Sequence, residues 1–96
     1  MATEELIKAT VFCTYHEIDY SFILLLEESG LLELQLVEEE KFIPHSQLQQ
    51  LEQMTRLHQD LEINIAGIDA IINLLQRMQE MREEMESMKN KLHFYE

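Results

Sequence analysis

Cys13 and His16 are the side chains whose types and spacing come closest to covalent chemistry. A cysteine becomes a useful nucleophile only when a base stands nearby, and His16, three residues later, is the only candidate. A lone cysteine between Phe12 and Tyr15 is more typical of a small buried hydrophobic residue. We therefore expect Cys13 to belong to the core, and we assign the chain no catalytic residue.

The remaining reactive side chains do not form a site either. His45, His58 and His93 stand far apart in the sequence, and none has a cysteine or second histidine at ligand spacing. A metal site needs three or four converging ligands. With only Gly30 and Gly67 in the chain, a glycine-rich phosphate loop cannot form. We expect no metal, no cofactor and no enzymatic activity.

Charge limits the classes of partner. The 96 residues carry a net charge of −12, and residues 1–40 hold ten acids against Lys8 alone. Nucleic acids and anionic membranes are bound by lysine and arginine that neutralise phosphate, so such a chain is repelled by both. A partner with a basic surface would be steered to the N-terminal half.

The last quarter of the chain carries a heptad stripe. Apolar residues recur there at alternating steps of three and four, with no glycine or proline between them. A stripe of this kind on one helix needs a second helix to cover it, which predicts a homodimer of undetermined strand direction. The predicted dimerisation residues are Ile71, Leu74, Met78, Met81, Met85, Met88 and Leu92, with Tyr95 continuing the pattern.

Two short helices are expected near the N-terminus, where Leu6 and Ile7 could form an edge strand or lead into the first helix. Thr10 can cap a helix that runs to about His16. Asp19 can cap the next helix, which runs to about Ser29 before a left-handed stop at Gly30. Their separation of three or four residues is the spacing of a helix-turn-helix.

A β-hairpin, or wing, is expected after the second helix. Alternating leucines from Leu31 onward predict a strand, Glu38–Glu40 a turn, and Lys41–Ile43 the returning strand. The turn contains no glycine or asparagine, so its type is not readable.

Two longer helices are expected to complete the chain. Ser46 and Gln49 form a capping box that predicts a helix to about Leu61, and Asn64 can cap a final helix from Ile65 to about His93. The predicted division is a domain at 1–63 and a dimerisation helix at 64–96.

The order of these elements resembles the winged helix-turn-helix of MerR-type regulators. The stretch Leu57–Leu75, LHQDLEINIAGIDAIINLL, is similar to a segment shared by HspR repressors and chaperone-modulator proteins of the CbpM type. The stretch Phe12–Glu33, FCTYHEIDYSFILLLEESGLLE, is similar to the second group in particular. The resemblance implies a mainly α, MerR-like winged helix-turn-helix with a small β-hairpin wing and a long C-terminal dimerisation helix.

Three positions depart from the family pattern. Glu17 stands where the family usually has a turn glycine, and Leu34 stands where a proline often follows the glutamate. The wing tip also lacks its usual glycine. A DNA-binding member would need bases on the second helix and the wing, whereas this second helix has none.

The resemblance to chaperone modulators implies a protein partner. These proteins are acidic, bind the J-domain of a DnaJ-like co-chaperone and keep it from stimulating its DnaK-type chaperone. Because J-domains carry a basic helix, the resemblance implies a modulator that captures this surface electrostatically and so inhibits the co-chaperone. The candidate partner-binding residues are Glu27, Glu28, Glu33, Glu38, Glu39 and Glu40.

Two other functions stay open. A MerR- or HspR-like transcriptional regulator would need the dimer to gather Lys8, Lys41 and Arg56 into one basic strip. A purely structural coiled-coil adaptor would have no affinity for a J-domain.

The expected location is the cytoplasm. The single cysteine excludes an intramolecular disulfide, and the N-terminus has no signal-peptide pattern. The longest wholly apolar run, Phe22–Leu26, is far too short to span a bilayer.

Overall fold

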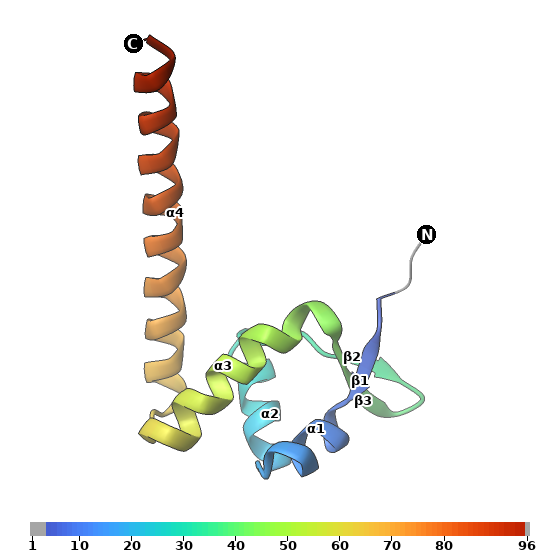
Figure 1. Cartoon of the computed structure of the whole chain (residues 1–96). Helices are drawn as coiled ribbons and strands as arrows, with labels where there is room; N and C mark the ends of the chain where they lie inside the picture. The colour runs from blue at the N-terminus through green and yellow to red at the C-terminus, as the bar shows by residue number, and fades with distance from the viewer. Residues whose placement is uncertain (1–3, 96) are drawn as a thin grey trace. The chain divides into compact units, whose positions relative to one another are not determined.

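A computed structural model describes residues 4–95 of the chain, with four helices and three strands among them (Figure 1). The chain forms two compact units, one through Ile65 and one from Ala66 onward. The elements in chain order are β1 (Leu6–Lys8), α1 (Ala9–His16), α2 (Tyr20–Glu28), β2 (Gln35–Val37), β3 (Glu40–Pro44), α3 (His45–Leu61) and α4 (Ile65–Tyr95).

Helices α1 and α2 form the expected helix-turn-helix. The predicted extent of α2 is confirmed to within one residue, with Asp19 at the N-cap position and Gly30 after the helix at a φ of 79°, but the Asp19 side chain makes no capping hydrogen bond. The predicted cap of α1 is wrong, because β1 continues directly into the helix, which begins at Ala9. Thr10 therefore lies inside the first turn, where its carbonyl accepts a hydrogen bond from Thr14 Oγ1 at 3.0 Å.

The three strands form an antiparallel sheet with β3 at its centre, in the order β1–β3–β2. The predicted strand from Leu31 is shorter than expected and begins only at Gln35. If β2 began earlier, its hydrogen bonds with β3 would extend to Pro44. That residue has no N–H to donate and immediately precedes α3. The Glu33 N–H instead donates to Gln47 Oε1 at 3.3 Å.

The wing turns through two consecutive glutamates. Val37 pairs with Glu40, so Glu38 and Glu39 form a two-residue loop, and both have a positive φ, 50° and 68°. Positive φ at both central residues defines a type I′ turn, which matches the twist of the flanking strands but favours Asn-Gly. Each left-handed glutamate costs roughly 1 kcal/mol relative to glycine.

Helix α3 begins one residue before the predicted capping box. Pro44 is its N-cap residue, so Ser46 lies within the first turn and cannot cap the helix with its hydroxyl. The cap comes from the chain before β1, because the Glu4 carboxylate accepts a hydrogen bond from the Ser46 N–H. Hydrogen bonding to the Ser46 side chain, followed by that to its N–H, lowers the pKa of Glu4. The capping-box prediction is wrong because the strand continues without a loop into the helix.

The core of the first unit is formed by side chains from the helix-turn-helix, the sheet and α3. Its fully buried side chains come from the helix-turn-helix (Ile23 and Leu26), the central strand (Ile43) and α3 (Leu51 and Met54). Both α2 and α3 thus bury one apolar face, as their helical spacing predicts. The sheet and α3 together hold the helix-turn-helix in place.

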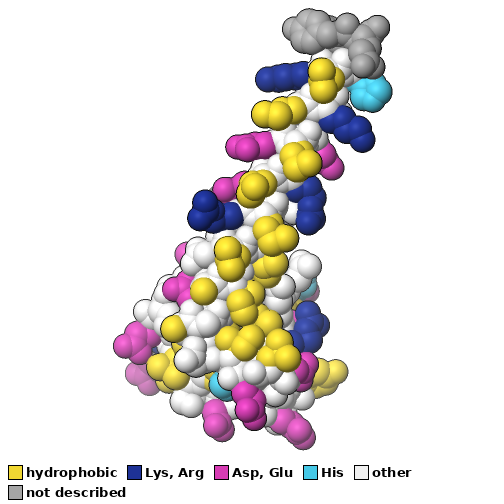
Figure 2. All heavy atoms as spheres, turned by 90° about the vertical axis from the view of Figure 1, so that its left-hand side faces the viewer, with side chains coloured by type: hydrophobic (Ala, Val, Ile, Leu, Met, Phe, Trp, Pro, Cys, Tyr) yellow, Lys and Arg dark blue, Asp and Glu magenta, His cyan; other side chains and the backbone are white. Residues whose placement is uncertain are grey.

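Helix α4 runs for 31 residues and begins and ends close to the predicted limits. Ile68 and Ile72 near its start are buried, whereas the apolar side chains from Leu74 to Leu92 are exposed. Figure 2 shows these side chains as a yellow line along the helix. Among residues 4–95, no helix is long and apolar enough to cross a membrane.

The wing turn generates a stability prediction. Glu38→Asn combined with Glu39→Gly should raise the free energy of unfolding by about 1 to 2 kcal/mol, because Asn and Gly adopt left-handed backbone at less cost. The measurement is urea denaturation followed by circular dichroism. Glu38→Gln with Glu39→Gln is the matched control, since it removes the same charge without relieving the backbone. An equal gain in the control would contradict the conformational explanation.

Candidate protein-binding surfaces

Two of the six predicted partner-binding glutamates are engaged within the chain. The Glu27 carboxylate on α2 pairs with the Lys41 ammonium on β3, and the Glu40 carboxylate lies 3.0 Å from the Lys8 ammonium on β1. The Glu27 contact is half-buried, and hydrogen bonding to Glu27 raises the pKa of Lys41. Glu27 therefore joins the helix-turn-helix to the wing.

The other four glutamates stand at the surface. Glu28 ends α2, Glu33 lies in the connection to β2, and Glu38 and Glu39 form the wing tip. All four are exposed, and within the described part of the chain none of them has an ion-pair partner. They are the predicted residues that remain available to an external cation.

The bases of the first unit are few and mostly paired. Residues 1–65 contain thirteen acids but only Lys8, Lys41 and Arg56 as bases, a net charge of −10. Lys8 and Lys41 are the two nearest the wing, and each pairs with a glutamate. Only Arg56, exposed on α3, has no ion-pair partner among residues 4–95. A surface able to neutralise DNA phosphates is therefore not assembled in this unit.

A groove of about 680 Å³ lies between the start of α2 and the end of α3, and the sequence did not reveal it. Its apolar lining comes from Ile18, Phe22, Leu25 and Ile65. Its polar lining includes three exposed acids and no lysine or arginine. These acids are Glu17, Asp19 and Glu62.

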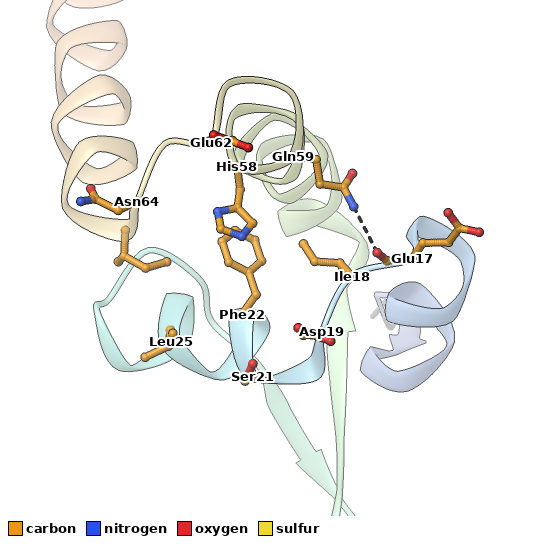
Figure 3. A pocket seen from close by; sticks show the side chains of 11 residues that line it. Glu17, Ile18, Asp19, Ser21, Phe22, Leu25, His58, Gln59, Glu62 and Asn64 are labelled. Atoms are coloured by element: carbon orange, nitrogen blue, oxygen red, sulfur yellow. Dashed lines mark hydrogen bonds between the residues drawn. The ribbon is translucent and has the colours of Figure 1, made fainter.

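Two contacts between α3 and the helix-turn-helix shape this groove (Figure 3). The His58 ring stacks on Phe22 with centroids 4.3 Å apart, while its Nδ1 lies 3.1 Å from the carbonyl oxygen of Ile63. Gln59 Nε2 donates to the carbonyl oxygens of His16 at 2.9 Å and Glu17 at 3.3 Å. Residues about forty positions apart are thereby brought to one site.

Comparison with known protein families identifies the scaffold. Residues 7–90 match the family described as MerR HTH family regulatory protein. The chain belongs to this family. Searches of curated proteins and of solved structures gave no significant match. The mainly α, winged helix-turn-helix prediction is thus confirmed at the level of the MerR family.

The turn after α1 in this MerR-family chain has a left-handed backbone. Glu17, where the sequence comparison expects a turn glycine, follows α1 with a φ of 54°. The Ile18 N–H then donates to the Cys13 carbonyl oxygen at 3.0 Å. The turn therefore has a conformation that glycine adopts easily, but it carries a carboxylate.

The side chains first considered for catalysis or metal binding do not converge in this MerR-family member. Cys13 is buried, and desolvation, followed by the charge of Asp19, raises the pKa of its thiol. A raised pKa disfavours the nucleophilic thiolate. Across the described residues, no three His, Cys, Asp or Glu side chains are grouped as a metal ion would need.

The pairing of Glu27 with Lys41 generates a second prediction. Glu27→Lys should lower the free energy of unfolding, because two ammonium groups would then face each other. Adding Lys41→Glu should recover most of this loss by restoring an opposite-charge pair. Chemical denaturation of the two single variants and the double variant measures the coupling. Additive effects in this cycle would mean that Glu27 is free to serve a partner instead.

Proposed function

We propose that this MerR-family chain is a protein-binding modulator of a DnaJ-like J-domain co-chaperone rather than a DNA-binding regulator. The observation that carries the proposal is the pairing of Lys8 and Lys41 with glutamates beside the wing. The surfaces that read DNA in a winged helix-turn-helix are here acidic, so they favour a basic protein surface. The resemblance of Phe12–Glu33 to chaperone modulators supports a J-domain as that partner.

Four exposed glutamates would provide the electrostatic attraction. Glu28 and Glu33 flank the end of α2, and Glu38 and Glu39 extend from the wing tip. Charges at such positions mainly accelerate encounter and select against partners of the same sign. By occupying the basic helix of the J-domain, the modulator would prevent that helix from reaching the DnaK-type chaperone.

The family match also supports the second candidate, a MerR-like transcriptional regulator, at the level of the fold. That function would require bases that the first unit alone does not offer, since only Arg56 is unpaired there within residues 4–95. A gel-shift experiment at low salt separates the two candidates. A specific DNA shift by the wild-type chain would favour the regulator.

The proposed modulator acts as a homodimer through α4. Its heptad side chains from Leu74 to Leu92 are between 53 % and 70 % exposed to solvent. A second α4 helix would remove this surface from water and gain about 25 cal/mol per Å² of apolar area. Both polar faces of the helix would stay in contact with solvent.

Binding to a J-domain tests the proposed function. Glu28→Lys with Glu33→Lys should weaken binding roughly tenfold at low salt, because two attractive charges become repulsive. Calorimetry with a purified J-domain, at low and at moderate salt, measures the change. The matched control is Glu80→Lys with Glu86→Lys, which alters the net charge equally but on the polar face of α4. If the wild-type chain fails to bind at either salt, the modulator function is excluded.

Assembly through α4 is tested separately. Met81→Glu with Met85→Glu should convert the dimer to a monomer, because four carboxylates would be placed along one apolar seam. Sedimentation equilibrium measures the mass directly. The control is Ser87→Glu with Asn90→Glu, which adds the same charge outside the heptad stripe and should leave the dimer intact. A monomeric wild-type chain would contradict the proposed assembly.

A further inference from the structure

The groove between α2 and α3 has the features of a binding site for a cationic, partly apolar segment. Leu25 offers its main apolar surface, being 47 % exposed although it is a large apolar residue, while Phe22 lies buried against His58. Its lining contains no lysine or arginine. An apolar floor with acids and no bases around it is complementary to a side chain that has an apolar stem and a positive end.

The acids of the groove come from separate elements. Glu17 follows α1, Asp19 precedes α2, and Glu62 follows α3. Figure 3 shows the Glu62 and Asp19 side chains on two sides of the His58 and Phe22 rings, while Glu17 lies farther out, beyond Gln59. A cation in this groove would have Asp19 and Glu62 on two sides, with Glu17 at the outer edge of the lining.

Two of these acids occupy positions where glycine is the easier residue. Glu17 and Glu62 both have left-handed backbone, with φ values of 54° and 53°. Left-handed φ is disfavoured for any residue with a Cβ, and such strain is commonly found at functional sites. Among residues 4–95, the two left-handed glutamates that follow a helix both line the same groove.

We propose that this groove is the anchor site for a lysine- or arginine-bearing segment of the partner protein. The aliphatic stem of the cation lies on Leu25 and Ile18, and its charged end lies between Asp19 and Glu62, with Glu17 at the outer edge. This inference rests on the proposed function and deepens it, because it separates two roles. The glutamates of the wing attract the basic partner, and the groove holds one of its side chains.

The anchor site can be tested with a variant that removes groove carboxylates without destabilising the fold. Glu17→Gly combined with Glu62→Gly removes two carboxylates and also relieves two left-handed side chains, so the melting temperature should stay equal or rise. We expect J-domain affinity, measured by calorimetry, to fall about tenfold, with most of the change in the dissociation rate. Glu80→Gln with Glu86→Gln on α4 is the matched control and should leave the affinity unchanged.

A second variant tests the apolar floor without changing the charge. Leu25→Gln alters an exposed side chain, so the fold is retained, and it should weaken binding several-fold at both low and moderate salt. The effect of the Glu17→Gly and Glu62→Gly changes, by contrast, is electrostatic and should become smaller as the salt concentration rises.

The outcomes separate this inference from the function on which it rests. If the wild-type chain binds a J-domain and both groove variants bind equally well, the groove is not the anchor site, although the modulator function stands. If the wild-type chain does not bind at all, the function and the anchor site are overturned together. Weaker binding of both groove variants, with the α4 control unchanged, supports the anchor site.

Discussion

Strand β3 connects every part of the first unit, because it pairs with β1 on one side and with β2 on the other. It buries Ile43 in the core, extends Lys41 to Glu27 on α2, and continues through Pro44 into α3. A five-residue strand thereby determines where the wing, the helix-turn-helix and α3 meet. Without its two ladders, the short strands on either side would have no partner, and an isolated short strand is not stable in water.

The sequence predicted those elements whose signals are local. Asp19 before an apolar run and Gly30 after it define α2, and a long pattern without breakers defines α4. The start of α3 was missed because its cap comes from Glu4, which lies 42 residues away. The wing type was unreadable because two glutamates adopt a conformation that a sequence reader assigns to Asn-Gly. The first failure comes from a tertiary contact, and the second from a backbone conformation that glutamate rarely adopts.

The candidate surfaces show the same division between local and distant information. The acids at the end of α2 and on the wing could be listed from their positions, but their pairing could not. Only the register of β3 against β2 and its proximity to α2 reveal that Glu27 is engaged with Lys41. The groove could not be predicted from the sequence at all. One of its walls forms only because Gln59 donates hydrogen bonds to the carbonyl oxygens of His16 and Glu17. No pattern within one segment indicates such a bridge.

The methionines of α4 affect how selectively that helix would pair with a second helix. Met78, Met81, Met85 and Met88 have unbranched side chains that adapt to surfaces of different shape. Branched residues at such positions would instead favour one interlocking arrangement. In the proposed dimer, a methionine seam would tolerate sliding between neighbouring registers, and the charges beside it, such as Arg82 and Glu84, would have to align the two helices. The affinity of α4 for a second helix and the register of their pairing would then depend on different side chains.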